Sequence, residues 1–414
     1  MTKQRVVVTG LGCLTPIGCN KDDFWKSLLE GKSGAKTIDF LDVDKLPVKF
    51  SASVKDFQSD KYFDKKDLKK MDLFLQYGMA AGIDAVADAK LLESQCNPDR
   101  IGVSIGSGIG GLYNIENTRD TFIKSGSRRI SPFFVPASII NMISGNLSIK
   151  YGFKGPNLSI VTACTTGTHN IGEGFRQIQY SHADVMICGG AEMATSDLGV
   201  GGFAAARALS TRNDSPETAS RPWDKDRDGF VLGDGAGVIV LEELEHAKKR
   251  GAKIYAEIKG YGMSADAYHM TLPSETGEGA SRCMTLALED ANLDPSNIDY
   301  INAHGTSTPA GDILELKAVK KTFGSHSKNL VINSTKSMIG HLLGAAGGVE
   351  AIVCILSILN VKIHQTINIE NLDQECDLNV NHESSIDCDI NFALSNSFGF
   401  GGTNGSLIFS KFKD

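Results

Sequence analysis

The sequence lacks every cysteine or histidine spacing that would indicate a disulfide framework or a zinc site. Its cysteines are odd in number, scattered over 414 residues and never form a C-x-x-C pair. Scattered free thiols are typical of a reducing compartment. No H-x-x-x-H pair is present either, so we expect no bound metal. The cysteines are Cys13, Cys19, Cys96, Cys164, Cys188, Cys283, Cys354, Cys376 and Cys388.

The sequence also lacks an apolar leader and a long apolar run. Met1–Gly10 contains only three consecutive valines after its basic residues, so it predicts an opening β-strand rather than a secretory signal. The longest apolar run, around Ala351 to Val361, is too short to cross a bilayer and indicates a buried helix. A net charge of −7 argues against general nucleic-acid binding. We expect a cytoplasmic protein that binds neither membrane nor nucleic acid.

What is present is an alternation of β-rich and helical segments, which is typical of an α/β fold with buried sheets. With 41% hydrophobic residues the chain can bury a large core. The charged segment 242–251 is predicted to be helical and to close a first half, which divides the chain into 1–251 and 252–414. A helix is predicted at 313–323, after Asp312 as N-cap. The predicted strands are 6–8, 101–105, 158–161, 185–188, 238–241, 254–258, 298–301, 330–333, 390–394 and 406–409.

Cys164 is the most informative residue. It lies in Leu158-Ser-Ile-Val-Thr-Ala-Cys-Thr-Thr-Gly-Thr-His169, where a predicted strand runs into a small-residue turn and then a helix. A helix start favours the nucleophilic thiolate, because unpaired N–H groups and the helix dipole stabilise negative charge there. His304 and His341 lie far downstream in glycine-rich loops, and one cysteine with two distant histidines is a catalytic pattern. His169 is predicted to point away from the thiol and to be structural.

The candidate residues share a position relative to the predicted strands. Cys164, His304, Lys336, His341 and the turn 398–402 each follow the C-terminal end of a strand. Sites in open α/β sheets gather at that edge, so these five segments are predicted to meet in one cleft.

Other motifs indicate rival functions. Gly106-Ser-Gly-Ile-Gly-Gly111 formally matches the dinucleotide-binding pattern G-x-G-x-x-G, but no second strand ending in an acidic residue follows it. Close backbone packing, or shaping of a pocket by Ile109, is the better interpretation. A Ser-Lys hydrolase is disfavoured because no G-x-S-x-G elbow is present. The glycines at 167, 172 and 174 predict that something packs closely against the helix after Cys164.

Five motifs together closely resemble the β-ketoacyl-[acyl carrier protein] synthases of the thiolase-like superfamily, and among them the elongating enzymes. The resemblance covers almost the whole chain. The motifs are Val161-Thr-Ala-Cys-Thr-Thr-Gly167, Arg221-Pro-Trp-Asp-Lys-Asp-Arg-Asp-Gly-Phe-Val-Leu-Gly-Asp-Gly-Ala-Gly237, Asn302-Ala-His-Gly-Thr-Ser-Thr-Pro-Ala-Gly-Asp312, Lys336-Ser-Met-Ile-Gly-His341 and Asn396-Ser-Phe-Gly-Phe-Gly-Gly-Thr-Asn404.

The resemblance implies a five-layered αβαβα fold of two similar halves, a homodimer, no cofactor and a Cys164-His304-His341 triad. It implies a decarboxylative Claisen condensation, in which malonyl-carrier attacks an acyl group held on Cys164 and lengthens it by two carbons. The resemblance implies that Lys336 sets the environment of the histidines and that the amides of Cys164 and Phe400 form an oxyanion hole. It implies that Phe398 and Phe400 gate entry of the second substrate, that Thr306 and Thr308 bind pantetheine, and that Ile109 lies at the closed end of the acyl pocket. Asp312, Glu315 and Glu350 would support these residues.

The resemblance also implies an acidic partner, the acyl carrier protein, for basic residues that would otherwise be solvated surface charges. These residues are Lys65, Lys66, Lys69, Lys70, Arg128, Arg129 and Arg207. A degradative thiolase is disfavoured, because the C-terminal glycine loop 399–404 has no second cysteine. A non-catalytic chain-length partner is disfavoured by the presence of Cys164. An active polyketide ketosynthase and a paralogue for a specialised lipid stay open.

Overall fold

One ten-stranded sheet runs through the computed structural model, which describes residues 3–414. The strand order is β10-β9-β13-β14-β8-β1-β7-β6-β4-β5. In the first half the strands are β1 (Val6–Leu14), β4 (Ile101–Gly106), β5 (Asn157–Leu158), β6 (Val185–Glu192) and β7 (Gly235–Glu243). In the second half they are β8 (Ala256–Ala265), β9 (Tyr300–Asn302), β10 (Val331–Asn333), β13 (Phe392–Gly399) and β14 (Thr403–Ser410).

The two halves of the sheet have matching connectivity. Outward from the centre the first half runs β1-β7-β6-β4-β5 and the second runs β8-β14-β13-β9-β10. In each half the first strand in the chain is central, the last two come next, and an intermediate pair forms the outer edge. The halves join where β1 and β8 pair antiparallel, with Val6 opposite Ile258. This repeated topology is the arrangement expected of two similar halves.

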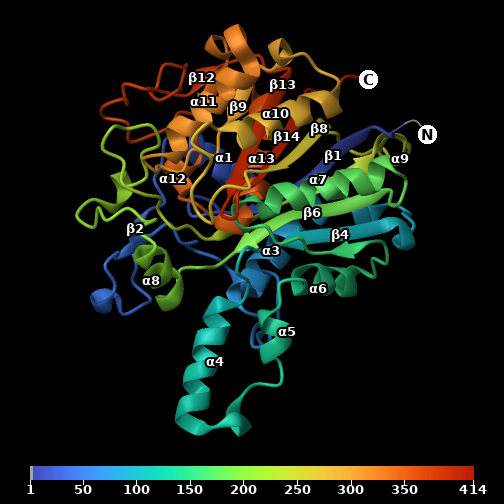
Figure 1. Cartoon of the computed structure of the whole chain (residues 1–414). Coiled ribbons are helices and arrows are strands. Elements are labelled where there is room, and N and C mark those ends of the chain that lie inside the picture. Colours follow the sequence, from blue (N-terminus) through green and yellow to red (C-terminus); the bar gives the residue numbers. More distant parts are fainter. Residues whose placement is uncertain (1–2) are drawn as a thin grey trace.

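Helices cover and separate the halves in five layers (Figure 1). The central layer is α7 (Thr166–Gln179) with α13 (Ala346–Asn360), which contact each other and strands of both halves. Outside the first half, α3 (Leu73–Asp88) packs on β1, β7 and β6. Outside the second half, α10 (Glu278–Ala291) packs on β8 and β14, and α11 (Gly311–Phe323) packs on α10. The predicted αβαβα architecture is confirmed.

The central helices approach their neighbours through glycine. A Cβ added to Gly167 would lie 2.6 Å from the Gly348 nitrogen, and one added to Gly174 would lie 2.1 Å from Cys188 Sγ. A Cβ on Gly348 would lie 2.2 Å from the carbonyl oxygen of Gly237. Real side chains do not tolerate such distances. The prediction that something packs closely against the helix after Cys164 is therefore confirmed.

Most of the remaining helices lie at the surface, and α4 with α5 projects from the body (Figure 1). This projection exposes Ile115, Phe122, Ile123, Phe133, Val135 and Ile139. The helices are α1 (Lys21–Leu29), α2 (Lys65–Leu68), α4 (Leu112–Ser125), α5 (Phe134–Ser138), α6 (Met142–Tyr151), α8 (Asp197–Ala205), α9 (Leu244–Lys249) and α12 (Lys336–Ile339). Short strand pairs add β2 (Lys36–Thr37) with β3 (Phe50–Ser51), and β11 (Lys362–Ile363) with β12 (Ile386–Asp387).

Three local predictions are wrong. The helix expected after Asp312 as N-cap begins at Gly311 with Ala310 as its cap residue, because Asp312 binds the amides of the preceding loop instead. The strand expected at 158–161 ends at Leu158, because side chains rather than a neighbouring strand bind the backbone that follows. Asn170 accepts the N–H of Ile160, and the Thr166 hydroxyl accepts that of Thr162. The apolar run is also longer than expected: Leu343–Asn360 is helical over 18 residues, which is enough to cross a membrane. As predicted it is a core helix, with 89% of the segment buried. The opening strand is predicted within Met1–Gly10, and the first two residues of that segment, Met1 and Thr2, lie outside the described residues.

The close contacts at glycine in the central helices lead to a testable prediction about stability. Gly348→Ala forces a methyl group against the backbone of β7, and we expect it to destabilise the fold by about 1–3 kcal/mol. Gly202→Ala, in α8, is the matched control, because no atom lies within 4 Å of its added Cβ. We expect it to be neutral or to stabilise by up to about 1 kcal/mol. Denaturant unfolding of both variants is the measurement, and equal stability of the two would contradict the packing argument.

Candidate active site

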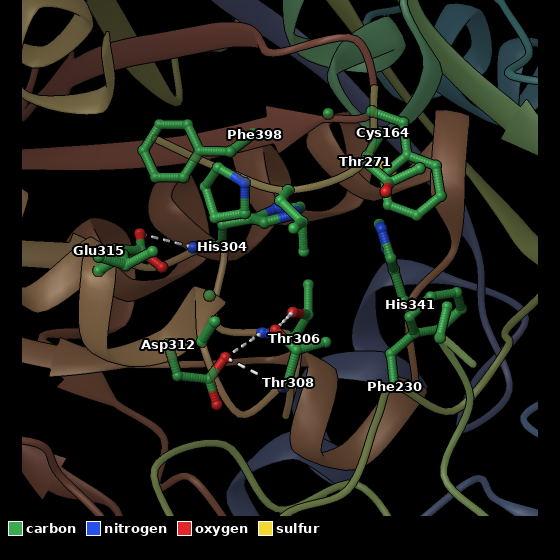
Figure 2. Close-up of a pocket in the computed structure, with 18 of the residues that line it drawn as sticks. Cys164, Phe230, Thr271, His304, Thr306, Thr308, Asp312, Glu315, His341 and Phe398 are labelled. Carbon is green, nitrogen blue, oxygen red and sulfur yellow. Dashed lines mark hydrogen bonds between the residues drawn. The ribbon is translucent and has the colours of Figure 1, made fainter. Parts of the chain in front are cut away.

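The residues named from the sequence surround one cavity of about 400 Å³. Cys164, His304, His341, Phe398 and Phe400 all line it, although they come from four separate segments of the chain. Figure 2 shows the cysteine and the two histidines around a shared space. The prediction that distant strand ends converge on one cleft is confirmed for these residues.

Cys164 lies in a tight turn at the start of α7. Residues 163–165 form a 3₁₀ turn that continues into the helix. Ala163 has a φ of +49°, a backbone conformation that residues other than glycine rarely adopt. Burial raises the pKa of Cys164 to about 11, while the N–H of Phe400 and the charge of Lys336 counter the rise. The expected stabilisation of the thiolate by backbone N–H groups is present, but desolvation outweighs it, so the thiol is protonated at neutral pH.

The backbone amides of Cys164 and Phe400 both face the cysteine sulfur, and both lower its pKa by hydrogen bonding. Phe400 lies in the turn between β13 and β14, where Gly401 and Gly402 have φ values of +86° and +70°. Neighbouring backbone fixes this turn, since the Gly401 N–H donates to the Met270 carbonyl at 2.7 Å. Two amides aimed at one sulfur can also bind a negatively charged oxygen that forms beside it.

The two histidines lie against each other and are neutral. The ring centroids of His304 and His341 are 5.2 Å apart and the rings are nearly perpendicular. Burial lowers both pKa values well below the usual range, and the positive charge of Lys336 lowers them further. His341 Nδ1 accepts the N–H of Leu343 at 3.3 Å, so the neutral ring has its proton on Nε2. That Nε2 is buried and has no hydrogen-bond partner among residues 3–414.

Glu315 and Asp312, at the start of α11, hold the loop that contains His304. Glu315 accepts the amides of His304 at 2.9 Å and Gly305 at 2.8 Å. Asp312 accepts the amides of Thr306 at 3.0 Å and Thr308 at 3.4 Å, and these contacts are drawn in Figure 2. The two threonine hydroxyls lie 3.0 Å apart and both residues line the cavity. The carboxylates thus replace water as acceptors for a buried loop.

Lys336 lies behind the histidines and does not line the cavity. Its side chain is 1% exposed, and its ammonium group pairs with the fully buried Glu350. Burial raises the pKa of Glu350 to about 7, and the neighbouring Lys336 counters that rise. One Glu350 oxygen, Oε2, has no hydrogen-bond partner among the described residues. Lys336 therefore acts on the site through its charge, which adds to the effect of burial in keeping both imidazoles neutral.

The other predicted residues lie at or outside the rim. Arg207 is exposed and lines the cavity, whereas Ile109 is 38% exposed and does not. Lys70 pairs with Asp67 at 2.7 Å. Lys65, Lys66, Lys69, Arg128 and Arg129 are exposed, the first three on or just after α2 and the arginines beyond α4.

Sequence reasoning missed three residues at the site. Phe230 packs edge-on against His341 with centroids 5.2 Å apart, and Phe203 contacts both Phe230 and Phe400. Glu192 binds the loop around Ile109. Phe230 lies within the motif Arg221–Gly237, but nothing in the spacing of that motif marked it as a residue of the site. His169 is structural as predicted: Nδ1 contacts the Thr162 hydroxyl and Nε2 the Asn404 carbonyl.

Known families match both halves of the chain. The beta-ketoacyl synthase N-terminal domain matches residues 3–247, and the corresponding C-terminal domain matches residues 255–370. The chain belongs to the beta-ketoacyl synthase family. A curated relative, 3-oxoacyl-[acyl-carrier-protein] synthase 2 of Vibrio harveyi, is 55% identical over 412 residues, which is 99% of each chain.

Solved beta-ketoacyl synthase structures superimpose on the whole chain. A beta-ketoacyl synthase from Burkholderia phymatum has a TM-score of 0.92 at 36% identity, and covers 99% of this chain and 100% of its own. A type II polyketide ketosynthase, solved in complex with its acyl-carrier protein and bound to a hexaketide, has the same TM-score at 33% identity, with the same coverage. The fold is therefore the thiolase-like ketosynthase fold, and the chain is an acyl-transferring, carbon–carbon bond-forming enzyme.

The buried ion pair of Lys336 with Glu350 leads to a testable prediction about the stability of this ketosynthase. Lys336→Met leaves Glu350 buried without its counter-charge, and we expect destabilisation by about 3–5 kcal/mol. Adding Glu350→Gln removes the unpaired charge and should recover much of that loss. Denaturant unfolding of the single and double variants is the measurement. A double variant no more stable than Lys336→Met would contradict the pairing.

Proposed function

We propose that this protein is a 3-oxoacyl-[acyl-carrier-protein] synthase that elongates fatty acyl chains by two carbons through decarboxylative condensation. The observation that supports it most directly is the convergence of Cys164, two neutral imidazoles and the Phe400 amide on one cavity. The 55% identity to the Vibrio harveyi relative over nearly the whole chain points to the same reaction.

In the first step, Cys164 takes the acyl group from its carrier. The sulfur attacks the thioester carbon, and the amides of Cys164 and Phe400 bind the oxyanion that forms. The bond to the carrier sulfur then breaks, and the carrier thiol leaves with the proton that Cys164 gives up. Each preorganised donor of this kind contributes about 3 kcal/mol to such a step. Because the resting thiol is neutral, proton loss accompanies attack rather than preceding it.

In the second step, malonyl-carrier loses CO2 and the remaining carbon attacks the acyl group. The electron pair of the broken carbon–carbon bond moves into an enolate, whose oxygen accepts N–H donors from His304 and His341. A neutral imidazole suits this role, since it donates an N–H hydrogen bond to the enolate oxygen without transferring its proton. The enolate carbon then attacks the acyl thioester, and the Cys164 sulfur leaves and regains a proton.

The remaining roles follow from position. Lys336, paired with Glu350, keeps the histidines neutral, and Asp312 and Glu315 position the His304 loop. Thr306 and Thr308 bind the pantetheine arm of the carrier. Phe398 packs 5.8 Å from the His304 ring and, with Phe400, gates entry of the second substrate. In this scheme the half formed by 1–251 supplies the nucleophile and 252–414 supplies the histidines.

The partner that suits the exposed basic residues is the acidic acyl carrier protein, in a cytoplasmic setting. We assign its docking surface to Lys65, Lys66, Lys69, Lys70, Arg128, Arg129 and Arg207. Arg207 stands at the cavity rim, where a carrier that delivers its arm must approach. The exposed apolar residues of the α4–α5 projection suit the interface of a homodimer.

A polyketide ketosynthase is the second candidate, because the structure aligns equally well with such an enzyme. The two functions differ in product. An elongating fatty acid enzyme extends a saturated acyl chain once for each cycle of reduction, whereas a polyketide enzyme extends an unreduced β-keto chain repeatedly. Product analysis with malonyl-carrier alone as extender separates them.

The first test is acylation of Cys164. We expect intact-protein mass spectrometry to show one acyl adduct after incubation with saturated acyl-carriers, and peptide mapping to place it on Cys164. The adduct should disappear as β-ketoacyl-carrier forms on addition of malonyl-carrier. Cys164→Ala, which keeps the other cysteines, is the control. No adduct from any carrier-linked chain on the folded protein would refute the function.

The second test separates acyl transfer to Cys164 from decarboxylation of malonyl-carrier. We expect His341→Ala to slow malonyl decarboxylation roughly 100-fold, the loss typical of one oxyanion donor, and to slow Cys164 acylation much less. Cys164→Ala should abolish condensation and retain some decarboxylation. His326→Ala, whose ring contacts the Ile298 carbonyl outside the cavity, is the control. Equal loss of both steps in His341→Ala would instead make His341 an activating base.

A further inference from the structure

The glycine-rich loop after β4 binds an anion, and that anion belongs to the chain itself. Glu192 ends β6 and is fully buried. Its Oε1 accepts the Ser107 hydroxyl at 2.7 Å and the Ile109 amide at 3.1 Å. Its Oε2 accepts the Gly108 amide at 2.7 Å and the Gly344 amide at 2.9 Å. The loop that resembles a phosphate cradle is therefore already filled by a carboxylate.

Three of the four partners of Glu192 are backbone amides, which can only donate, and the fourth, the Ser107 hydroxyl, already accepts the Gly110 N–H at 3.0 Å. This is the pattern of an ionised carboxylate, because a protonated one would need an acceptor for its own hydrogen. Burial raises the pKa of Glu192, and these hydrogen bonds counter the rise by stabilising the charged form. A negative charge is thus held inside the protein by donors that replace water.

The backbone around Glu192 leaves no room for side chains. A Cβ on Gly108 would lie 2.7 Å from Glu192 Oε2, and a Cβ on Gly344 would lie 2.3 Å from the Gly108 nitrogen. A Cβ on Gly190 would lie 2.1 Å from the Gly344 carbonyl oxygen. Gly108 and Gly344 therefore meet at one carboxylate, and Gly190 packs against Gly344, which fixes the three segments relative to one another.

Each segment bound by Glu192 leads to the catalytic cavity. Gly344 follows Leu343, which lines the cavity, and lies three residues after His341. A Cβ on Gly108 would lie 3.5 Å from the carbonyl oxygen of Ala163, the residue before Cys164. The carboxylate is also close enough to Cys164 for its charge to raise the pKa of the thiol. One side chain thus joins the loop that contains Ile109 to the segment after His341, and that loop packs against the nucleophile turn.

We propose that Glu192 is a positioning residue for acyl transfer, which holds Leu343, a residue of the cavity wall, against Cys164 and thereby sets the acyl chain lengths that the enzyme accepts. The chain-length part of this inference depends on the proposed function. The other part, which places the charge of Glu192 beside Cys164, does not depend on the proposed function.

Glu192→Gln is the test variant, because it keeps the shape and one acceptor but replaces the other oxygen with a donor. Whichever oxygen it replaces, that donor faces at least one backbone amide that the carboxylate accepted, Ile109 at Oε1 or Gly108 and Gly344 at Oε2, so the loop is loosened. We expect the ratio of acylation rates for tetradecanoyl-carrier and hexanoyl-carrier to change by about 10-fold, the effect of reshaping an apolar pocket by a methylene group. A ratio within one variant is independent of the fraction of active enzyme.

The pH dependence of Cys164 alkylation by iodoacetamide is a second measurement and needs no carrier. Removing the negative charge should move its midpoint to lower pH in Glu192→Gln, as a direct readout of the charge beside the thiol. Ser107→Ala removes one donor and keeps the charge, so it should change the chain-length ratio less and leave the midpoint unmoved.

Asp299→Asn is the matched control. Asp299 also accepts two backbone amides, those of Asn391 and Phe392, but it precedes β9, at the opposite end of that strand from His304. We expect its chain-length ratio and alkylation midpoint to equal those of the parent.

A folded Glu192→Gln protein with the parental ratio and the parental midpoint would overturn the inference. If Glu192→Gln does not fold, Ser107→Ala decides the chain-length part, and a parental ratio there overturns it. If the parent itself forms no acyl adduct, the proposed function fails. The alkylation midpoint then still tests whether Glu192 acts at Cys164, and an unshifted midpoint refutes it.

Discussion

The close approach of α7 and α13 between the two halves of the sheet is the constraint on which the rest of the structure depends. Both helices pass their neighbours at glycine, and Gly167 faces Gly348 without space for a methyl group. Cys164 immediately precedes α7, and His341 lies a short turn before α13. Because the helices meet at their backbones, the nucleophile and a histidine that are far apart in the sequence are brought to the same cavity.

Burial decides the electrostatics of that cavity. Desolvation keeps the Cys164 thiol protonated and both histidines neutral, and the charge of Lys336 reinforces the neutrality of the histidines. The charges that are buried nearby are each matched: Lys336 by Glu350, Asp312 and Glu192 by backbone amides. The site therefore presents neutral donors towards substrate and confines full charges to the surrounding shell, where they hold loops in place.

The sequence predicted the fold class and the residues of the cavity because these depend on local patterns. Alternating segments indicated α/β layers, and the motifs around Cys164, His304 and His341 were specific enough to name a family. Local patterns failed where a tertiary contact replaces a regular one. The strand expected through Val161 stops at Leu158 because Asn170 and Thr166 bind its backbone. Glu192 and Phe203 had no signal at all, since each is an isolated residue whose partners lie in distant segments.

By itself, the sequence determined the chemistry available to this protein: the nucleophilic thiol of Cys164, two histidines in glycine-rich loops, and glycines wherever helices must pass closely. Residue types and short spacings are enough for that, because they set which atoms can react and which backbones can touch. Only the tertiary structure decided the protonation states and the shape of the site. A pKa depends on how far a group is removed from water, and the position of a loop depends on the carboxylate that binds it. Both are properties of contacts between residues that the chain keeps far apart.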